Sequence, residues 1–353
     1  RRQRQMCIRD SMKSIRLGRS ELIVSKPGMG CLPLQRCGME QAVKLLQDAY
    51  DGGIRFFDTA NAYTDSEKKL GMALADVRGN IVISTKSAAR TRDGVLAHIE
   101  NSLKMLNTDY IDLFQFHQVT ELPDPNDPAG AYAGALEAKE RGWIRHIGVT
   151  SHRVNIAEEC IASGYFETLQ FPFSYISSER DLALADKCRE ADMGYIAMKG
   201  LAGGMLTNVR ACHAFMNEYD NVVPIWGIQR PEELRQWLDI AEEDPHMDEE
   251  LSAFIKKERQ ELAGSFCRSC GYCMPCTVGI EIFNCARMNM LLRRSPWRQY
   301  FTPEWQTKMA KIDECVGCGL CASRCPYQLD TPNLLKYMLK DYREFYEAHK
   351  DEL

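Results

Sequence analysis

Four polar side chains that can exchange protons follow short apolar runs in the first part of the chain. Asp58 ends one run, and Tyr63 lies five residues beyond it. Lys86 and His117 each follow a later run directly. A free tyrosine has a pKa of about 10, too high for ready proton transfer at neutral pH. A nearby ammonium lowers that pKa, and a carboxylate can hold the ammonium in place. The residue types therefore predict acid–base catalysis, with His117 orienting a substrate oxygen.

The cysteines gather in the last third of the chain, where nine of the 15 lie between Cys267 and Cys325. The segment 315–326 has the spacing C-x₂-C-x₂-C-x₃-C-P. This spacing places three thiolates around one iron–sulfur cubane and directs the fourth toward a second cubane. Zinc or free thiols are the alternatives, but a zinc site usually takes four ligands as two separated pairs. The segment therefore predicts cluster ligands.

A second run of cysteines, 267–276, is one residue shorter before its last cysteine, and Thr277 stands where the other run has proline. Together the two runs supply eight thiolates, enough for two [4Fe-4S] clusters. We expect crossed ligation, in which the last cysteine of each run binds the cluster of the other run. One cluster would then be bound by Cys267, Cys270, Cys273 and Cys325, and the other by Cys315, Cys318, Cys321 and Cys276.

The elements that must position the first group of residues are visible in the hydrophobic pattern. Residues 12 to about 240 alternate short apolar runs with amphipathic stretches of helical length. About eight such runs predict a closed parallel (β/α)₈ TIM barrel. An open doubly wound sheet is the alternative, but no Gly-x-Gly-x-x-Gly follows the first run. The expected strands are 29–34, 55–58, 81–85, 110–116, 144–150, 168–171, 194–198 and 222–226.

Catalytic side chains of a TIM barrel lie at the carboxyl ends of its strands. Each of the predicted residues alone also has a structural explanation: Asp58 as a helix cap, Lys86 as a surface charge and His117 as a core histidine. Their occurrence at successive strand ends, with Tyr63 close by, favours one shared site over four unrelated roles.

The pattern changes near Asp244–Pro245 from strand–helix alternation to helices and cysteines. We therefore expect a barrel domain at 12–244 and a mainly helical, ferredoxin-like dicluster domain at 245–353. Residues 1–11 are basic and lack the apolar run of a secretory signal. Because residues 6–10 back-translate to a sequence like a sequencing adapter, we expect 1–11 to be an assembly artefact and Met12 the native start.

Composition limits the function classes. A formal charge of −5 gives no basic excess for nucleic acid, so we expect no such partner. No apolar stretch reaches the length of about 18 residues that a membrane span needs. Cysteines clustered as ligands, without a secretory signal, predict a reducing, cytoplasmic compartment.

Several motifs resemble those of the aldo-keto reductases. They are 57–63 (Phe-Asp-Thr-Ala-Asn-Ala-Tyr), 83–86 (Ile-Ser-Thr-Lys), 116–117 (Phe-His) and 147–152 (Ile-Gly-Val-Thr-Ser-His). The resemblance implies a TIM barrel that transfers a hydride from NAD or NADP to a small-molecule carbonyl. It also implies that Tyr63 is the general acid, that Lys86 and Asp58 tune it, and that His117 positions the carbonyl.

The same resemblance implies a set of cofactor contacts. Met198 stands where the family usually has an aromatic residue that stacks on the nicotinamide, and a glycine-rich loop follows it. Arg230 could pair with a 2′-phosphate or simply open a helix, so the choice between NAD and NADP stays open. The expected contact residues are Thr150, Ser151, Gln170, Met198, Lys199, Leu201, Gln229 and Arg230.

The cysteine runs resemble helical dicluster ferredoxin domains, and the whole chain resembles aldo-keto reductases with a C-terminal 4Fe-4S domain. The leading hypothesis is a carbonyl reductase whose clusters connect it to a one-electron carrier protein. A redox-responsive nicotinamide-binding sensor, or a reductase with purely structural clusters, is the alternative. The substrate and the oligomeric state do not follow from the sequence.

Overall fold

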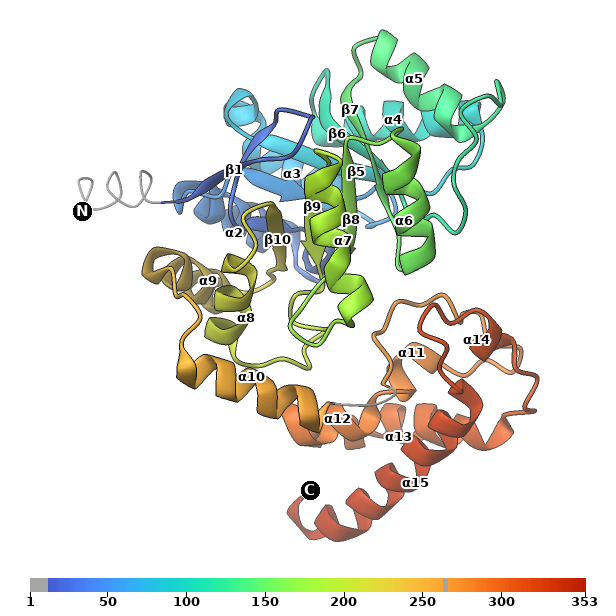
Figure 1. The fold of residues 1–353 in the computed structure, drawn as a ribbon. Coiled ribbons are helices and arrows are strands. Elements are labelled where there is room, and N and C mark those ends of the chain that lie inside the picture. The colour runs from blue at the N-terminus through green and yellow to red at the C-terminus, as the bar shows by residue number, and fades with distance from the viewer. Residues whose placement is uncertain (1–11, 263–265) are drawn as a thin grey trace. The chain divides into compact units, whose positions relative to one another are not determined.

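The first structural unit is a closed barrel of eight parallel strands (Figure 1). The computed structural model describes residues 12–262 and 266–353. The strands follow one another around the barrel in the order β10-β3-β4-β5-β6-β7-β8-β9, so the barrel prediction is confirmed and the open sheet is excluded. The barrel strands are β3 (Gly28–Gly30), β4 (Phe56–Asp58), β5 (Val82–Ser87), β6 (Ile111–Phe116), β7 (Ile144–Thr150), β8 (Thr168–Pro172), β9 (Gly194–Met198) and β10 (Val222–Gly227).

Helices alternate with these strands because their sequences are amphipathic. In α2 (Met39–Asp51) the buried residues Ala42, Leu45, Leu46 and Ala49 recur three or four positions apart, so one stripe faces the barrel. The remaining barrel helices are α3 (Ser66–Leu74), α4 (Arg92–Leu106), α5 (Ala131–Glu140), α6 (Val154–Ser163), α7 (Glu179–Glu190), α8 (Val209–Asn217) and α9 (Pro231–Glu243).

A short antiparallel hairpin, which the sequence pattern did not predict, precedes the barrel. Its strands are β1 (Ser14–Arg16) and β2 (Ile23–Ser25). Leu17 and Val24 of this segment are fully buried in one apolar cluster with Phe56, at the beginning of β4, and with Val223 near the beginning of β10. The hairpin therefore packs against the amino-terminal ends of the strands, which leaves the carboxyl ends for polar side chains.

The register of the barrel brings the predicted polar residues close together. Asp58 pairs with Ser84 between β4 and β5, and Lys86 pairs with Gln115 between β5 and β6. Thr150 pairs with Gln170 between β7 and β8.

The second structural unit is helical and carries the cysteine runs. It comprises residues 201–207 and 256–353, and the first unit comprises the rest. The sequence predicted a division after residue 244. In the structure the units divide within α10 (Glu249–Glu261), and the segment 201–207 belongs to the second unit. The other helices are α11 (Ile282–Cys285), α12 (Met288–Arg294), α13 (Pro303–Ala310), α14 (Leu320–Ser323) and α15 (Thr331–His349).

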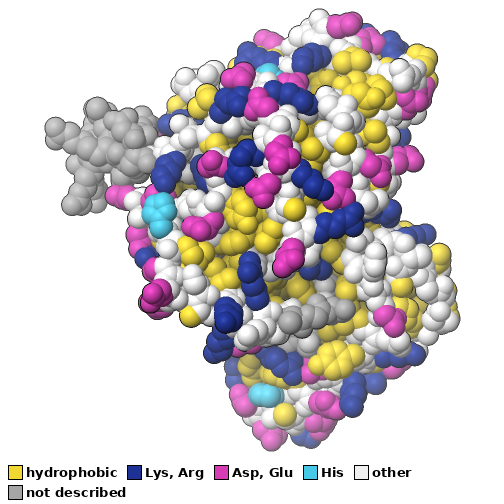
Figure 2. All heavy atoms as spheres, viewed as in Figure 1, with side chains coloured by type: hydrophobic (Ala, Val, Ile, Leu, Met, Phe, Trp, Pro, Cys, Tyr) yellow, Lys and Arg dark blue, Asp and Glu magenta, His cyan; other side chains and the backbone are white. Residues whose placement is uncertain are grey.

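Acidic and basic side chains are mixed on the face drawn in Figure 2, and no patch of one sign covers it. Ion pairs join charged side chains of the described residues, such as Arg180 and Lys187 with Glu158. In the described part of the chain, no helix has both the length and the apolar character needed to cross a bilayer. The predicted artefact at 1–11 lies outside the described residues.

Candidate active site and iron–sulfur cavities

A buried ion pair forms the base of the predicted catalytic group. The Nζ atom of Lys86, on β5, lies 2.6 Å from Oδ2 of Asp58, at the end of β4. It also donates to the carbonyl oxygen of Thr59 at 2.6 Å. Lys86 is 1% exposed and Asp58 is 2% exposed. Lys86 is therefore neither a surface charge nor free to move, because two oxygens hold its ammonium group.

Tyr63 and His117 complete the group. Their ring centroids are 5.8 Å apart and the rings are nearly perpendicular. The Nζ atom of Lys86 lies 5.5 Å from the centroid of the Tyr63 ring. His117 directly follows β6 and is 9% exposed. The structure thus brings together all four residues that the sequence singled out at the strand ends.

The electrostatics of Tyr63 differ from the expectation. Burial and the negative charge of Asp58 raise the pKa of Tyr63, whereas the sequence argument expected the ammonium of Lys86 to lower it. The physical reason is that burial disfavours the charged phenolate, and the negative charge of Asp58 adds to this effect. Tyr63 therefore keeps its proton throughout the neutral range.

His117 is a neutral imidazole. Burial, with the positive charges of Lys86 and Arg90, lowers the pKa of His117 to about 3. A neutral imidazole has one nitrogen that donates and one that accepts a hydrogen bond. His117 can therefore orient a polar oxygen without carrying a charge.

The residues that follow the strand ends adopt an unusual backbone. Thr64 after Tyr63, Gln118 after His117 and Lys199 after Met198 have φ values of 44°, 53° and 58°. Non-glycine residues rarely adopt this left-handed conformation, and such residues cluster at functional sites. The three positions lie beside residues that the sequence had selected for independent reasons.

A polar network below the site was missed by the sequence analysis. Gln115 on β6 donates from Nε2 to Ser84 Oγ at 2.7 Å and to Gln170 Oε1 at 2.8 Å. Gln170 in turn approaches Asp58 Oδ2 at 3.4 Å. All four side chains are buried. The signal was present in the sequence: Gln115 interrupts the apolar stretch 113–116 two residues before His117.

The predicted nicotinamide contacts occupy neighbouring strands. Thr150 Oγ1 accepts a hydrogen bond from the backbone N–H of Gln118 at 2.8 Å, so its own hydroxyl hydrogen remains to be donated. Ser151 Oγ donates to the carbonyl oxygen of Val119 at 3.0 Å. Gln170 is held by Gln115. These hydroxyl and amide groups are of the kind that can form hydrogen bonds with a carboxamide.

Met198 ends β9 and Lys199 follows it, but Leu201 begins the segment that belongs to the second unit. Within that unit, Arg287 Nη1 donates to the carbonyl oxygen of Gly203 at 2.8 Å. Arg294 Nη1 donates to the carbonyl oxygen of Met205 at 3.0 Å. The glycine-rich loop after Met198 is therefore held by arginines of the helical unit.

Gln229 and Arg230 begin α9. Arg230 donates from Nε and Nη2 to Glu233 Oε1, at 2.9 and 2.7 Å. The backbone N–H of Gln229 donates to Glu233 Oε2 at 2.9 Å. In this structure Arg230 opens the helix, the second of the two roles considered for it. Nearby, Trp237 stacks on Trp226 with ring centroids 3.9 Å apart.

The cysteines of the second unit line two cavities. The first cavity is lined by one set of four cysteines, together with Arg268 and Tyr327. Arg268 lies 4.3 Å from the Tyr327 ring centroid, a cation–π distance. The cysteines of this cavity are Cys267, Cys270, Cys273 and Cys325.

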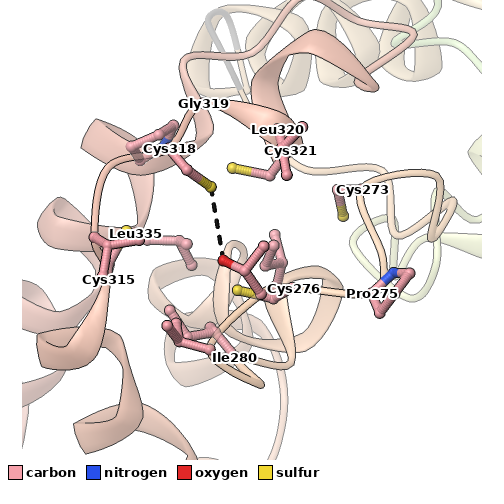
Figure 3. A pocket seen from close by; sticks show the side chains of 15 residues that line it. Cys273, Pro275, Cys276, Ile280, Cys315, Cys318, Gly319, Leu320, Cys321 and Leu335 are labelled. Atoms are coloured by element: carbon pink, nitrogen blue, oxygen red, sulfur yellow. Dashed lines mark hydrogen bonds between the residues drawn. The ribbon is translucent and has the colours of Figure 1, made fainter.

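The second cavity, drawn in Figure 3, is lined by the other set, and Cys273 also reaches it. The sulfurs of Cys276, Cys318 and Cys321 point into the same space. Cys318 is exposed, and Val316 beside it is 68% exposed, so this cavity opens at the surface. The cysteines that line it are Cys276, Cys315, Cys318 and Cys321, with Cys273 at its edge.

The donor chemistry fits iron–sulfur clusters. Each cavity collects at least four thiols from two segments far apart in the sequence, as cubane ligation requires, and Cys273 lines both cavities. Within 12–262 and 266–353, no three His, Cys, Asp or Glu side chains are arranged to hold a single metal ion. Cys285, by contrast, is fully buried on α11 and lines neither of these cavities.

Comparison with known proteins identifies both units. The model of the aldo/keto reductase family matches residues 28–222, more than half of the chain. The chain belongs to the aldo/keto reductase family. Residues 266–330 of this aldo/keto reductase match a 4Fe-4S dicluster domain, which spans both cysteine runs. It is therefore an oxidoreductase of that family with a C-terminal 4Fe-4S dicluster domain.

Individual relatives of this aldo/keto reductase resemble its barrel. The uncharacterized oxidoreductase YqkF of Bacillus subtilis is 30% identical over 56% of this chain and 67% of its own length. The aldo-keto reductase YhdN of the same organism is 29% identical over 47% of this chain and 54% of its own length. The chain thus covers two thirds of the length of YqkF and just over half of the length of YhdN.

Solved structures share the fold. An aldo-keto reductase from Bacillus halodurans in its holo form has 22% identity and a TM-score of 0.59, over 70% of this chain and 96% of that one. An aldo-keto reductase from Klebsiella pneumoniae, solved in complex with NADPH, has 20% identity and a TM-score of 0.59, over 70% and 94%.

Proposed function

We propose that the protein reduces a small-molecule carbonyl with NADPH or NADH, and that Tyr63 supplies the proton. The convergence of Tyr63, His117, Lys86 and Asp58 at the strand ends carries this proposal. A proton donor, a neutral hydrogen-bonding imidazole and a fixed ammonium are the groups that a carbonyl oxygen needs when it becomes an alcohol.

Each residue has a separate task in this reaction. A bound nicotinamide would supply the hydride for the carbonyl carbon. Tyr63 gives its proton to the carbonyl oxygen, and its raised pKa ensures that the proton is present at neutral pH. His117 orients that oxygen through a hydrogen bond. Lys86, held by Asp58, lies beside the Tyr63 ring and stabilises the phenolate left after transfer.

The nicotinamide would be held by groups on β7 and β8. Thr150 retains a hydroxyl hydrogen for the carboxamide oxygen, and Gln170 offers an amide fixed by Gln115. Ser151 lies next to Thr150. Met198 ends β9, which neighbours β8 in the barrel, and Lys199 follows it. The NADPH complex of the Klebsiella pneumoniae enzyme supports this class of cofactor. Arg230 would meet a 2′-phosphate only after leaving Glu233.

The Tyr63→Phe variant tests the reductase proposal. We expect NADPH-dependent turnover of a panel of aldehydes and ketones to fall by about 10²- to 10⁴-fold, the usual contribution of a positioned acid. Nucleotide binding, measured by protein fluorescence, should be retained. Tyr165→Phe, on the barrel surface, is the matched control. Undiminished turnover by Tyr63→Phe would refute the role of Tyr63, and a retained redox response without turnover would favour a sensor.

We also propose that the two cavities hold [4Fe-4S] clusters that exchange electrons with a one-electron carrier protein. Two sets of four cysteines around separate cavities support this proposal. The clusters would supply one-electron chemistry, while the barrel handles electrons in pairs. The exposed position of Cys318 gives a carrier access to the second cavity.

Anaerobic addition of NADPH or NADH to the purified protein tests this coupling. Bleaching of the visible iron–sulfur absorbance, together with an EPR signal of a reduced cluster, is the expected result, and the more effective nucleotide identifies the cofactor. Clusters that stay oxidised while the nucleotide binds would contradict direct coupling. Two explanations would then be left: the clusters receive electrons from a separate donor, or they have a structural role.

A further inference from the structure

The side chain of Thr277 contacts a cysteine from the other run. Its Oγ1 atom lies 3.7 Å from Sγ of Cys318, a hydrogen bond drawn as a dashed line in Figure 3. The two residues are 41 positions apart. Thr277 directly follows Cys276, at the position where the other run has Pro326. A proline there could not offer a hydroxyl, so this contact is a feature of the shorter run.

The direction of this hydrogen bond follows from the chemistry of the ligand. A cysteine bound to iron is a thiolate, which has no hydrogen to donate and can only accept. Thr277 must therefore be the donor when the cavity is occupied. Hydrogen bonds to the sulfur ligands are among the factors that set the reduction potential of an iron–sulfur cluster.

We propose that the Thr277 hydroxyl raises the reduction potential of the cluster held by Cys276, Cys315, Cys318 and Cys321. The proposal rests on the iron–sulfur assignment above. Reduction adds one electron, and thus one negative charge, to the cluster and its thiolates. A donor directed at Cys318 stabilises that charge, so the reduced form gains more from the hydrogen bond than the oxidised form.

The first cavity has a sulfur donor of another kind. There the backbone N–H of Ser269 lies 3.4 Å from Sγ of Cys267. The hydroxyl of Thr331, which also lines that cavity, donates to the carbonyl oxygen of Leu329 at 3.3 Å. Thr277 contributes its donor from a side chain, so a substitution can remove it without changing the backbone. Its effect should therefore be confined to one of the two clusters.

Thr277→Val and Thr277→Ser separate the hydroxyl from the shape of the side chain. Valine keeps the branched shape and loses the donor, whereas serine keeps the donor. Ser323→Ala is the control, because the Ser323 hydroxyl lies in the same region but donates to the carbonyl oxygen of Leu320 at 3.0 Å. The full-length protein, prepared without oxygen, is titrated with dithionite in the presence of mediators and followed by EPR and visible absorbance.

We expect Thr277→Val to shift one of the two reduction steps to a more negative potential and to leave the other unchanged. Thr277→Ser and Ser323→Ala should match the parent protein. The same titration in a Cys270→Ala background, where the first cluster is disrupted, identifies the shifted step with the second cavity. If that protein does not load iron, the two-step titration curve of the protein with all its cysteines still shows whether Thr277→Val shifts only one step.

The two possible failures are distinguishable because iron and acid-labile sulfide are measured on every sample. Full cluster content with unchanged potentials in Thr277→Val, or an equal shift of both steps, would overturn the proposed role of Thr277 and leave the iron–sulfur assignment intact. Absence of iron and sulfide from the parent protein would overturn the iron–sulfur assignment itself, and this inference with it.

Discussion

The ammonium of Lys86 and the carboxylate of Asp58 form a buried ion pair at 2.6 Å across two neighbouring barrel strands, although the residues are 28 positions apart. The pair connects the end of β4 with β5 and lies directly beside the Tyr63 ring. Lys86 and Asp58 thus contribute both to the stability of the barrel and to the proposed chemistry.

Removing the charge of Asp58 should destabilise the protein strongly. Asp58→Asn leaves the ammonium of Lys86 buried without its counter-charge, and breaking a buried pair in this way costs about 3 kcal/mol or more. Urea unfolding followed by circular dichroism measures this loss. Asp48→Asn is the control, because Asp48 pairs with Lys44 on the surface of α2. That change should cost less than about 1 kcal/mol. Equal effects of the two variants would show that Lys86 finds sufficient compensation elsewhere.

The neutral state of His117 should make the barrel sensitive to acid. Its pKa is about 3 in the folded protein and about 6.5 in an unfolded chain, so unfolding takes up a proton between these values. The stability from this group is complete above about pH 6.5 and decreases as the pH falls toward 3. Between pH 6.5 and pH 5 the loss is about 2 kcal/mol.

His117→Gln should remove this part of the pH dependence, which urea unfolding at pH 6.5 and pH 5 measures. His213, buried with a pKa lowered to about 4, provides a second group of the same kind. The double variant with His213→Gln should therefore show a still flatter profile. An unchanged pH profile in His117→Gln would mean that this imidazole is protonated, or accessible to water, in the folded protein.

Single cysteine variants should divide into two groups according to the cavities. Cys325→Ala should abolish the same EPR signal as Cys267→Ala, and Cys276→Ala the same signal as Cys315→Ala, because each pair lines one cavity. Iron content should fall from about eight to about four per chain in each variant. Cys285→Ala is the control and should retain all iron. If Cys325 instead grouped with Cys315, ligation would follow the order of the sequence and not the cavities.

Gln115 should affect the nicotinamide through Gln170. Gln115→Leu removes the donor that holds Gln170 Oε1 at 2.8 Å and leaves buried polar groups without this partner. We expect the dissociation constant for the preferred nucleotide to rise by about 10-fold, equivalent to about 1.4 kcal/mol, in a fluorescence titration. Gln47→Leu, on the exposed face of α2, should bind as the parent does. Unaltered binding by Gln115→Leu would remove Gln170 from the proposed contacts.

The sequence by itself determined the class of fold and the residue types that are available for chemistry. Apolar runs and amphipathic stretches predicted the barrel strands, and polar residues at their ends predicted a common site for Tyr63, Lys86 and His117. The spacing of the cysteines predicted cluster ligands. These predictions depend on local pattern and residue type, because hydrophobic alternation and ligand spacing are properties of residues that are close together in the sequence.

The tertiary structure decided features that depend on long-range contacts. Whether eight strands close into a barrel depends on the pairing of β10 with β3, the last and the first barrel strands along the chain. Likewise, the pKa of Tyr63 rises because burial of the phenol and the negative charge of Asp58 oppose the phenolate, and the sequence did not reveal that burial. The contact of Thr277 with Cys318 joins two segments that no local pattern relates. Residue types and spacing are local properties, whereas burial and contact partners arise only when distant segments pack together.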